Sequence, residues 1–377
     1  MTFHMAMVAG EASGDLLASL LLKGLKARWP EIHAYGIGGP AMAQEGFQAR
    51  WPSDRLAVRG YVEVLRHFPD IWNIRRQLSR QLIQERPQIF VGVDAPDFNL
   101  GLERQLRSCG MKTVHFVCPS IWAWRGGRVH RISQSTDHVL CLFPFEPALL
   151  EPHGLRATFV GHPLADVIPM EPPRTLARGS LGLRDADTVI ALLPGSRRSE
   201  VAYIAATLFE AAARIDRLQP GAQFVVPVAA GLRSQVQAIL ATLKGPPIQL
   251  VEGRSHEVLA ACDLTLIASG TATLEAALFK RPMVVAYKMH PLSWAMMKRM
   301  AYQPWVSLPN ILARDFLVPE LIQEACTAQA LATEALAWLN DAQRRKQVQE
   351  QFHHIHCVLR RDTARCAADA IAKEIES

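Results

Sequence analysis

Short, continuously apolar runs recur along the chain, and each is followed by a segment with apolar residues at helical spacing. Such runs are typical of parallel strands covered on both faces, and their alternation with helices is typical of α/β sheets. The first series predicts strands at residues 3–9, 32–37, 89–93, 113–117, 139–143 and 158–160, and the second at residues 189–193, 224–228, 248–251, 264–268 and 283–287. The pattern therefore predicts two parallel α/β sheets.

A segment rich in proline separates the two series. Residues 163–173 contain four prolines, which is typical of an interdomain linker. Ligands of parallel sheets bind beyond the carboxyl ends of the strands, so we expect a cleft beside this linker. We predict a first domain at residues 1–165, a second at 166–342 and a helical tail at 343–377. The tail either returns to the first domain or reaches another subunit.

Length and composition indicate a folded protein with more than one core. The chain has 377 residues, of which 49% are hydrophobic and 20% charged, and one core seldom serves a chain of this length. Charged residues interrupt every run that approaches the roughly 20 apolar residues of a membrane span. Residues 1–9 contain neither a cationic region nor a cleavage site, so we expect a first strand instead of a signal peptide, and a cytoplasmic location.

The formal net charge of +6 favours an anionic partner. Nucleic acid is the weaker candidate, because the basic residues are spread along the chain without a recognition motif, whereas a phosphorylated substrate and an acidic lipid surface stay open. The seven cysteines include no CxxC pair, which indicates reduced thiols. Helical spacing places at most two of the possible ligands in residues 353–357 on one face, so we favour surface histidines over a metal site there. We also predict no cofactor.

The first candidate site residues follow the first predicted strand. Gly10 permits a tight turn, and Ser13 or Asp15 suits the cap of the next helix. Glu11 stands at the tip of the strand, where a carboxylate is a candidate for binding a sugar hydroxyl. The alternative is a capped turn alone, which explains Asp15 but not Glu11.

Two acidic residues follow the strand predicted at residues 89–93. We assign Asp94 to the cleft as a candidate acid or base, and Asp97 or Asn99 to the cap of the following helix. The alternative is that both acids serve only the turn and the cap, as Asp-Pro segments often do.

Two strand-to-helix turns of the second series predict anion sites. Gly195, Ser196 and Arg197 precede a long helix, so their N–H groups, the positive helix end and the guanidinium suit a phosphate. The turn is not a P-loop, because no Gly-Lys-Ser/Thr triplet follows.

The second turn, Ser269-Gly270-Thr271, is a junction of the same kind. Glu275 lies one helical turn beyond Thr271 on the same face, where it suits a ribose diol. The alternative makes Glu275 an exposed helix carboxylate.

Aromatic and basic residues are mixed in two further segments. Trp122, Trp124 and Arg125 suit stacking on a sugar or base and binding a phosphate, or else the tryptophans belong to a core beside a basic helix.

Residues 64–83 place apolar side chains, including Phe68, Ile71 and Trp72, among arginines at near-helical spacing. This pattern suits an interfacial helix at an anionic membrane surface. The alternative is an amphipathic helix packed on its own domain. Pro69 predicts two short helices instead of one.

Seven motifs occur in order over almost the whole chain: GEASGD, VGVDAPDFN, PSIWAWR, VGHPLAD, LPGSR, ASGTATLE and SLPNIL. Each is weak alone, but together in this order they are specific. On these motifs the chain resembles the lipid-A-disaccharide synthase family, inverting glycosyltransferases of outer-membrane lipid biosynthesis. The resemblance implies the GT-B form of α/β fold, in which two Rossmann-like domains with parallel sheets face each other across a cleft.

The resemblance also implies the reaction and its residues. The donor would be UDP-2,3-diacylglucosamine and the acceptor 2,3-diacylglucosamine 1-phosphate (lipid X), and they would give the β(1→6) disaccharide 1-phosphate and UDP without a metal. Asp94 in DAPDFN and Arg197 in LPGSR match the essential acid and arginine of the family. Glu11 in GEASGD and Asn310 in SLPN match positions near the reacting sugars.

In such a protein the first domain would bind the acceptor and its lipid, and the second the UDP-sugar. We expect peripheral association with the inner face of the cytoplasmic membrane, and a homodimer if the tail reaches another subunit. Two other functions stay open: a UDP-sugar epimerase of the same fold, and a nucleotide- or lipid-binding protein without turnover.

Overall fold

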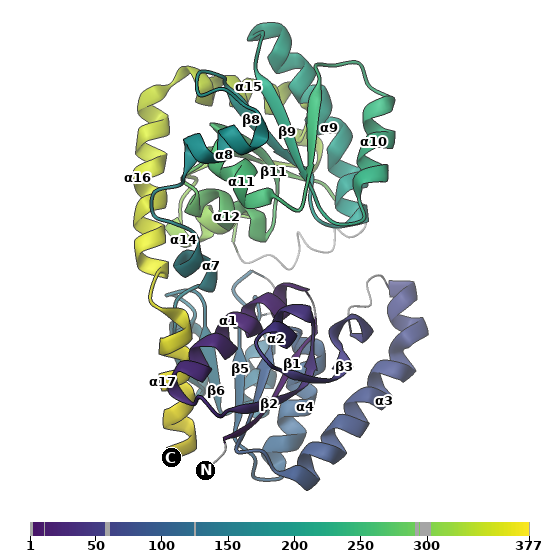
Figure 1. The fold of residues 1–377 in the computed structure, drawn as a ribbon, viewed down its shortest axis with the longest axis vertical. Coiled ribbons are helices and arrows are strands. Elements are labelled where there is room, and N and C mark those ends of the chain that lie inside the picture. Colours follow the sequence, from purple (N-terminus) through teal and green to yellow (C-terminus); the bar gives the residue numbers. More distant parts are fainter. Residues whose placement is uncertain are drawn as a thin grey trace. The chain divides into compact units, whose positions relative to one another are not determined.

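The computed structural model describes residues 3–10, 12–56, 61–123, 126–290, 294 and 303–376, and of residues 12, 54 and 61–68 it describes the backbone alone. The chain divides into two compact units (Figure 1). Unit 1 comprises Met1–Asp166 and Leu359–Ser377, and unit 2 comprises Val167–Val358. The boundary expected at 342/343 falls at the start of helix α16 (Ala342–Leu359), which belongs to unit 2 as far as Val358.

Unit 1 is built on a parallel sheet of seven strands in the order β3-β2-β1-β4-β5-β6-β7. The strands are β1 (His4–Ala9), β2 (His33–Gly38), β3 (Gln48–Pro52), β4 (Ile89–Val93), β5 (Thr113–Phe116), β6 (His138–Cys141) and β7 (Arg156–Phe159). The strand order reverses between β1 and β4, and in doubly wound sheets ligands bind outside the carboxyl ends at that point.

Helices cover both faces of this sheet. They are α1 (Ala12–Arg28), α2 (Pro40–Gln44), α3 (Tyr61–Glu85), α4 (Pro96–Ser108), α5 (Arg128–Ser135), α6 (Pro147–Leu150) and α17 (Thr363–Glu376), with 3₁₀ turns at Ser53–Arg55 and Glu151–His153. Because side chains alternate along a strand, Met5 and Met7 of β1 join one core cluster with α1 and α17, whereas Ala6 and Val8 join another with α3 and α4. Each large apolar side chain that is fully buried contributes about 1.5–3 kcal/mol, so these clusters hold the layers together.

The C-terminal helix α17 packs on α1 within unit 1 (Figure 1). Gly24 of α1 permits a close crossing, since a Cβ there would lie 2.2 Å from the Cβ of Ala364. Arg28 and Asp369 form an ion pair of 2.7 Å between the two helices. The tail of this chain thus completes the unit in which the chain begins.

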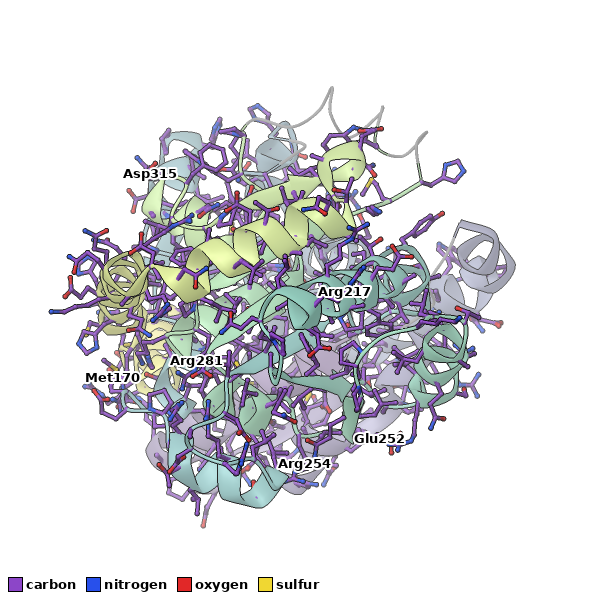
Figure 2. All side chains as sticks on the ribbon, turned by 90° about the horizontal axis from the view of Figure 1, so that it is seen from above. Met170, Arg217, Glu252, Arg254, Arg281 and Asp315 are labelled. Carbon is purple, nitrogen blue, oxygen red and sulfur yellow. The ribbon has the colours of Figure 1, made fainter. Side chains whose placement is uncertain are left out.

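Unit 2 contains a parallel sheet of six strands in the order β10-β9-β8-β11-β12-β13, which reverses between β8 and β11. The strands are β8 (Val189–Leu193), β9 (Gln223–Val228), β10 (Ile248–Glu252), β11 (Leu264–Ala268), β12 (Met283–Tyr287) and β13 (Glu320–Ile322). The helices are α8 (Arg174–Leu181), α9 (Arg198–Leu218), α10 (Arg233–Ala241), α11 (Ser255–Ala261), α12 (Thr271–Leu278), α14 (Leu308–Ala313), α15 (Ala328–Asn340) and α16, with a 3₁₀ turn at Gln323–Ala325. Helix α7 (Pro163–Val167) lies where the chain passes from unit 1 to unit 2. Charged side chains such as Arg217, Glu252 and Asp315 are exposed on unit 2 (Figure 2).

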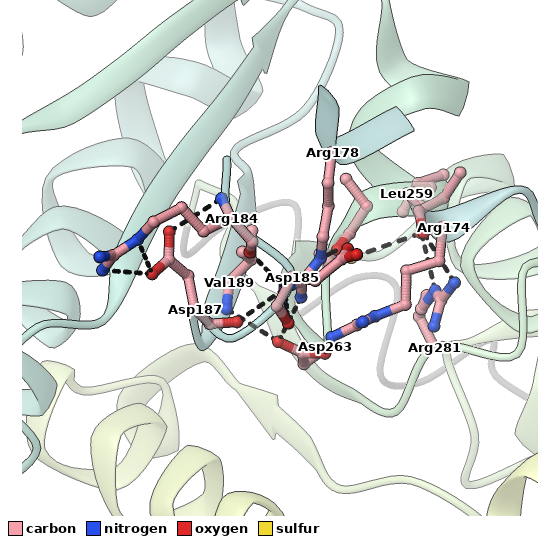
Figure 3. A network of polar contacts seen from close by, with 12 residues as sticks. Arg174, Arg178, Arg184, Asp185, Asp187, Val189, Leu259, Asp263 and Arg281 are labelled. Atoms are coloured by element: carbon pink, nitrogen blue, oxygen red, sulfur yellow. Dashed lines mark hydrogen bonds and ion pairs between the residues drawn. The ribbon is translucent and has the colours of Figure 1, made fainter. Parts of the chain in front are cut away.

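Arg178 of α8 ties together the amino ends of β8 and β11 (Figure 3). Its guanidinium is fully buried and donates to the Ala261 carbonyl at 2.9 Å and to the Asp263 carboxylate at 2.8 Å. It also donates to the carbonyls of three residues that lead into β8, at 2.8–2.9 Å: Arg184, Asp185 and Asp187. The planar fork of an arginine suits so many acceptors at fixed angles. This network lies at the end of the sheet opposite to the predicted anion turns.

The predicted α/β fold of two Rossmann-like sheets is confirmed, but two local expectations need correction or completion. Helix α3 continues through Pro69, so the predicted break is wrong. Proline removes one backbone hydrogen bond, and Ile74, Leu78 and Leu82 fix the rest of this helix in the core. The edge strands β3 and β13 were not predicted, because neither is an apolar run.

Among the described helices, none combines the length and apolarity needed to cross a membrane.

Candidate functional site

The carboxyl ends of β1 and β4 lie side by side in unit 1. Ala9 is in register with Val93, so the chain leaves both strands at the same level of the sheet. A Cβ on Gly10 would lie 3.0 Å from the Cβ of Ala95, and only glycine fits between the two turns without a shift. The structure therefore places Asp94 beside the GEASGD turn, as expected of two motifs at a switch point.

Asp94 and Ala95 both adopt left-handed backbone conformations, with φ of 50° and 44°. Non-glycine residues seldom do so, and such strain concentrates at functional sites. The Asp94 N–H donates to the Phe116 carbonyl at 2.9 Å, and the Asp94 carbonyl accepts from the Asn99 amide at 2.8 Å. The backbone of the candidate acid is thus held on both sides.

The predicted capping of α4 by Asp97 or Asn99 is wrong. The N-cap residue is Ala95, which has no side-chain cap bond. Asn99 points back to the strand ends, and Asp97 forms an exposed ion pair of 3.0 Å with Arg128. Both side chains interact with residues outside α4, and the spacing of residues along the sequence does not show such contacts.

Glu11 lies outside the described residues, and its neighbours show what the turn does. Ser13 is exposed in the first turn of α1. Asp15 is buried and accepts from the N–H groups of Gly39, Ala41 and Met42 at 2.8–3.1 Å. Asp15 therefore caps α2 and not its own helix, which corrects the expected cap.

A buried ion pair between an acid and a histidine joins α4 to β5. Glu103 of α4 contacts Nδ1 of His115 of β5 at 2.7 Å, and neither side chain is exposed. Burial alone lowers the pKa of His115, but the charge and hydrogen bond of Glu103, together with the charge of Asp94, outweigh it and raise the pKa. The sequence pattern does not mark this pair, because its members lie within a helix and a strand.

Trp122 is half-buried in an aromatic cluster near the end of β6, while Trp124 and Arg125 lie outside the described residues. Its ring meets those of Phe143 and Phe145 edge-on, with centroids 6.1 and 5.7 Å away. Its indole N–H donates to Glu146 at 3.0 Å, and the Phe143 N–H donates to the other oxygen at 3.0 Å. Burial raises the pKa of the Glu146 carboxyl to about 8.

Within the described part of the chain, one group of side chains has the spacing of metal ligands: Cys118, Cys141 and Glu146, with ligand atoms within 4.8 Å of one another. Both carboxylate oxygens of Glu146 already accept N–H groups. The hydrogen bond to Cys118 and burial raise the pKa of the Cys141 thiol. These features favour a protonated Cys141 thiol in the core over a metal site.

Helix α3 turns different residues to the core and to solvent. Ile74 and Leu78 are buried, Ile71 is half-buried, and Trp72 is 47% exposed. The Arg76 guanidinium lies 5.3 Å from the centre of the Trp72 ring. The side chain of Phe68 lies outside what the structure describes. An exposed tryptophan beside an arginine is therefore separate from the stripe that packs on the sheet.

In unit 2 the LPGSR turn joins β8 to α9 at the second switch point. Gly195 has φ of 111°, and a Cβ there would lie 2.5 Å from Oε2 of Glu200. That oxygen accepts from the N–H groups of Ser196 and Arg197 at 3.0 and 3.3 Å. The Arg197 side chain is 56% exposed and contacts Oε1 of Glu200 at 3.1 Å. The donors expected to bind an anion thus already hold a carboxylate.

The ASGTATLE turn joins β11 to α12 beside it. Gly270, with φ of 150°, and Thr271 are exposed at the start of the helix. Glu275 is partly exposed and contacts Nε2 of His256 at 3.2 Å. The Ser269 hydroxyl donates to the Val306 carbonyl at 2.7 Å, which brings the SLPN segment to this turn.

Asn310 is fully buried in α14. Its amide donates to the Val318 carbonyl at 2.9 Å and to the Glu320 carboxylate at 2.8 Å, and its oxygen accepts from the Val318 N–H at 3.0 Å. Glu320 also accepts from Ser307. Asn310 therefore fixes the SLPN segment, and its side chain already has partners within unit 2.

Structure comparisons define the fold. The UDP-GlcNAc 2-epimerase of Neisseria meningitidis bound to UDP-GlcNAc is 12% identical, with a TM-score of 0.68 over 99% of this chain and 100% of that chain. A glycosyltransferase of Rickettsia africae, also 12% identical, has a TM-score of 0.61 over 100% of this chain and 99% of that chain. At this identity the likeness shows the fold alone, which is the two-domain fold of GT-B glycosyltransferases and related epimerases.

Sequence comparisons define the family. The family described as lipid-A-disaccharide synthetase matches residues 5–375. The lipid-A-disaccharide synthase of Verminephrobacter eiseniae is 57% identical over 98% of this chain and 96% of that protein, and that of Burkholderia pseudomallei strain K96243 is 53% identical over 99% and 97%. The chain belongs to the lipid-A-disaccharide synthase family. The resemblance inferred from the seven motifs is confirmed, and with it the glycosyltransferase class.

Proposed function

We propose that this chain transfers the diacylglucosamine group of UDP-2,3-diacylglucosamine to O6 of lipid X, and so forms the β(1→6) lipid A disaccharide 1-phosphate and UDP. The observation that carries the proposal is the family match over residues 5–375, with the family's motifs at both switch points of the sheets. The acceptor is assigned to unit 1 and the UDP-sugar to unit 2.

In this proposal Asp94 is the general base. The acceptor hydroxyl transfers its proton to the Asp94 carboxylate while its oxygen forms a bond to C1 of the donor sugar. The bond from C1 to the diphosphate oxygen breaks on the opposite face, so the configuration at C1 inverts and UDP leaves with the electron pair. A positioned base contributes about 10²–10⁴-fold to such a step. Glu11 is assigned to the reacting sugars as a second carboxylate.

The leaving diphosphate needs positive charge and N–H donors. Arg197, with the N–H groups of Ser196 and of the turn at Gly270 and Thr271, can supply both at the starts of α9 and α12. The diphosphate would replace the Glu200 carboxylate on these donors. Glu275 is assigned to the ribose, with His256 beside it. No step of this scheme uses a metal.

Because both proposed substrates carry acyl chains, we assign the enzyme to the membrane surface. Trp72 is exposed beside Arg76 on α3, which suits an interfacial contact with anionic headgroups at the inner face of the cytoplasmic membrane. Phe68 and Ile71 are assigned to the same contact, and Ser13, Trp122, Trp124 and Arg125 to the acceptor side. In a homodimer formed through the tail, α17 of one copy would pack on α1 of the other copy, with the same contacts that it makes here within one chain.

UDP formation with and without lipid X tests the proposal. A transferase releases UDP only when donor and acceptor are both present, and the disaccharide appears in equal amount. An epimerase converts the donor sugar without an acceptor, and a binding protein yields neither product. Formation of UDP or of an epimer independent of lipid X would overturn the proposal.

A further inference from the structure

We propose that Asn99 is a positioning residue for Asp94, which sets the turn that aims the Asp94 carboxylate and the spacing between the ends of β1 and β4. The inference rests on the proposed role of Asp94 as the base. It assigns a task to a buried amide that the reaction scheme leaves unused.

The side-chain amide nitrogen of Asn99 contacts backbone carbonyl groups at the ends of two strands, β1 and β4. The Asn99 Nδ2 group donates to the Asp94 carbonyl at 2.8 Å, and lies 3.3 Å from the Val8 carbonyl of β1 and 3.4 Å from the Val93 carbonyl of β4. The short bond to Asp94 is the strong one, and the two longer contacts share the remaining donor capacity. Asn99 thus joins the strand that ends at Asp94 to the strand that ends at the GEASGD turn.

The turn that Asn99 holds is strained. Asp94 and Ala95 are both left-handed, and residues held in such conformations cost about 1–3 kcal/mol each. They persist only where the surroundings fix them. Here the Asn99 amide binds the Asp94 carbonyl, and the N–H groups of Phe98 and Asn99 both donate to the Ala95 carbonyl at 3.0 Å. Without the amide, the Asp94 carbonyl loses the side-chain donor that keeps it turned towards α4.

The side chain of Asn99 is itself confined by the close packing of α4 on β4. A Cβ on Gly92 would lie 3.0 Å from the Cβ of Asn99 and 2.1 Å from Oε1 of Glu103, so α4 lies directly on β4 at this glycine. One helical turn after Asn99, Glu103 fixes α4 to β5 through His115 at 2.7 Å. This support locks the amide in the position from which it reaches Asp94, as precise catalytic geometry requires.

A matched control separates positioning from stability, because a buried amide also contributes to folding. Thr136 is fully buried in unit 1 and its hydroxyl donates to the carbonyls of Thr113 and His138 at 3.0 and 3.2 Å. These bonds lie at the amino ends of β5 and β6, away from Asp94. Thr136→Val therefore removes comparable buried hydrogen bonds without touching the turn.

The test is the turnover of Asn99→Ala per folded molecule, with folded enzyme counted by circular dichroism and donor binding by UDP calorimetry. We expect kcat to fall about 100-fold or more, since a misplacement of about 1 Å can cost that much, while UDP affinity stays within about threefold. Thr136→Val should lower the melting temperature and keep kcat within about twofold. Asn99→Asp has the same shape but no amide donor, and it should reproduce the loss of kcat if Asn99→Ala does not fold.

A double-mutant cycle completes the test. If Asn99 acts through Asp94, Asn99→Ala has almost no further effect in an Asp94→Asn background. Near-normal kcat of folded Asn99→Ala or Asn99→Asp, or an additive loss in the double variant, overturns the inference alone. Near-normal kcat of Asp94→Asn instead removes the proposed base itself, and the positioning role falls with it.

Discussion

The carboxylate of Glu200 binds back onto Arg197, the residue that precedes its own helix. One oxygen lies 3.1 Å from the Arg197 guanidinium, and the other accepts the Arg197 N–H at 3.3 Å. In the proposed reaction a diphosphate would use the same donors, so Glu200 and the substrate would compete for one place at the start of α9.

Glu200→Gln should therefore strengthen UDP binding. Glutamine retains an oxygen for the cap of α9 but removes the negative charge that a diphosphate must displace. We expect the Kd for UDP to fall about three- to tenfold, which corresponds to roughly 0.7–1.4 kcal/mol. Isothermal titration calorimetry measures it, with Glu210→Gln, an exposed residue of the same helix, as the control. Unchanged or weaker binding would show that Glu200 does not compete with the ligand.

Arg197→Ala should have the opposite effect on UDP. A charge-assisted hydrogen bond contributes about 1.5–3 kcal/mol, so the Kd should rise on the order of tenfold or more. Arg198 is exposed at the next position, and Arg198→Ala should leave the Kd within about twofold. Equal effects of the two substitutions would mean that only the overall charge matters, and would remove Arg197 from the phosphate site.

Trp72→Ser separates a membrane contact from a core contact. Trp72 is 47% exposed, so its replacement should weaken sedimentation with phosphatidylglycerol vesicles while the melting temperature stays the same. Two residues along α3, Ile74 is 8% exposed and belongs to the core. Ile74→Ser should destabilise the fold by about 2–5 kcal/mol, by analogy with other truncations in cores. Normal vesicle binding of Trp72→Ser would rule out this side chain as an anchor.

Glu146 should make stability depend on pH. Burial raises its pKa from 4.5 to about 8, so the stability linked to its protonated form is complete below 4.5 and is lost as pH rises to about 8. Relative to Glu146→Gln, the wild-type protein should lose on the order of 1 kcal/mol or more of unfolding free energy between about pH 5 and 8. Denaturant unfolding at several pH values measures this difference. Glu151→Gln, at an exposed position nearby, is the matched control.

The sequence predicted the fold well where burial dictates the residues. Strands such as β4 and β8 are buried along their whole length and therefore read as continuous apolar runs. The edge strand β3 is mostly exposed and carries Arg50 and Pro52, so no apolar run marked it. Pro69 predicts a break, but the core contacts of the following turns hold α3 together.

The candidate site could be located from the sequence, but its internal contacts could not. Strand ends and glycine turns mark the switch points, because every doubly wound sheet places them there. Asp15 caps a helix that begins 25 residues later, and Asn99 reaches a strand 91 residues earlier. Glu200 accepts the N–H groups of Ser196 and Arg197 at the start of α9, but the N-cap residue Arg197 has no acceptor atom, so no capping-box signature marks this contact in the sequence.

The position of α17 determines when each unit can finish folding as the chain is synthesised. Ala367 and Ile371 of this last helix belong to the same core cluster as Leu21 and Leu22 of the first. The apolar face of α1 is therefore covered only after α17 has left the ribosome, whereas unit 2 ends at Val358 and has its whole core available earlier. The core of unit 1, which contains the first residues of the chain to be synthesised, is thus completed after the core of unit 2.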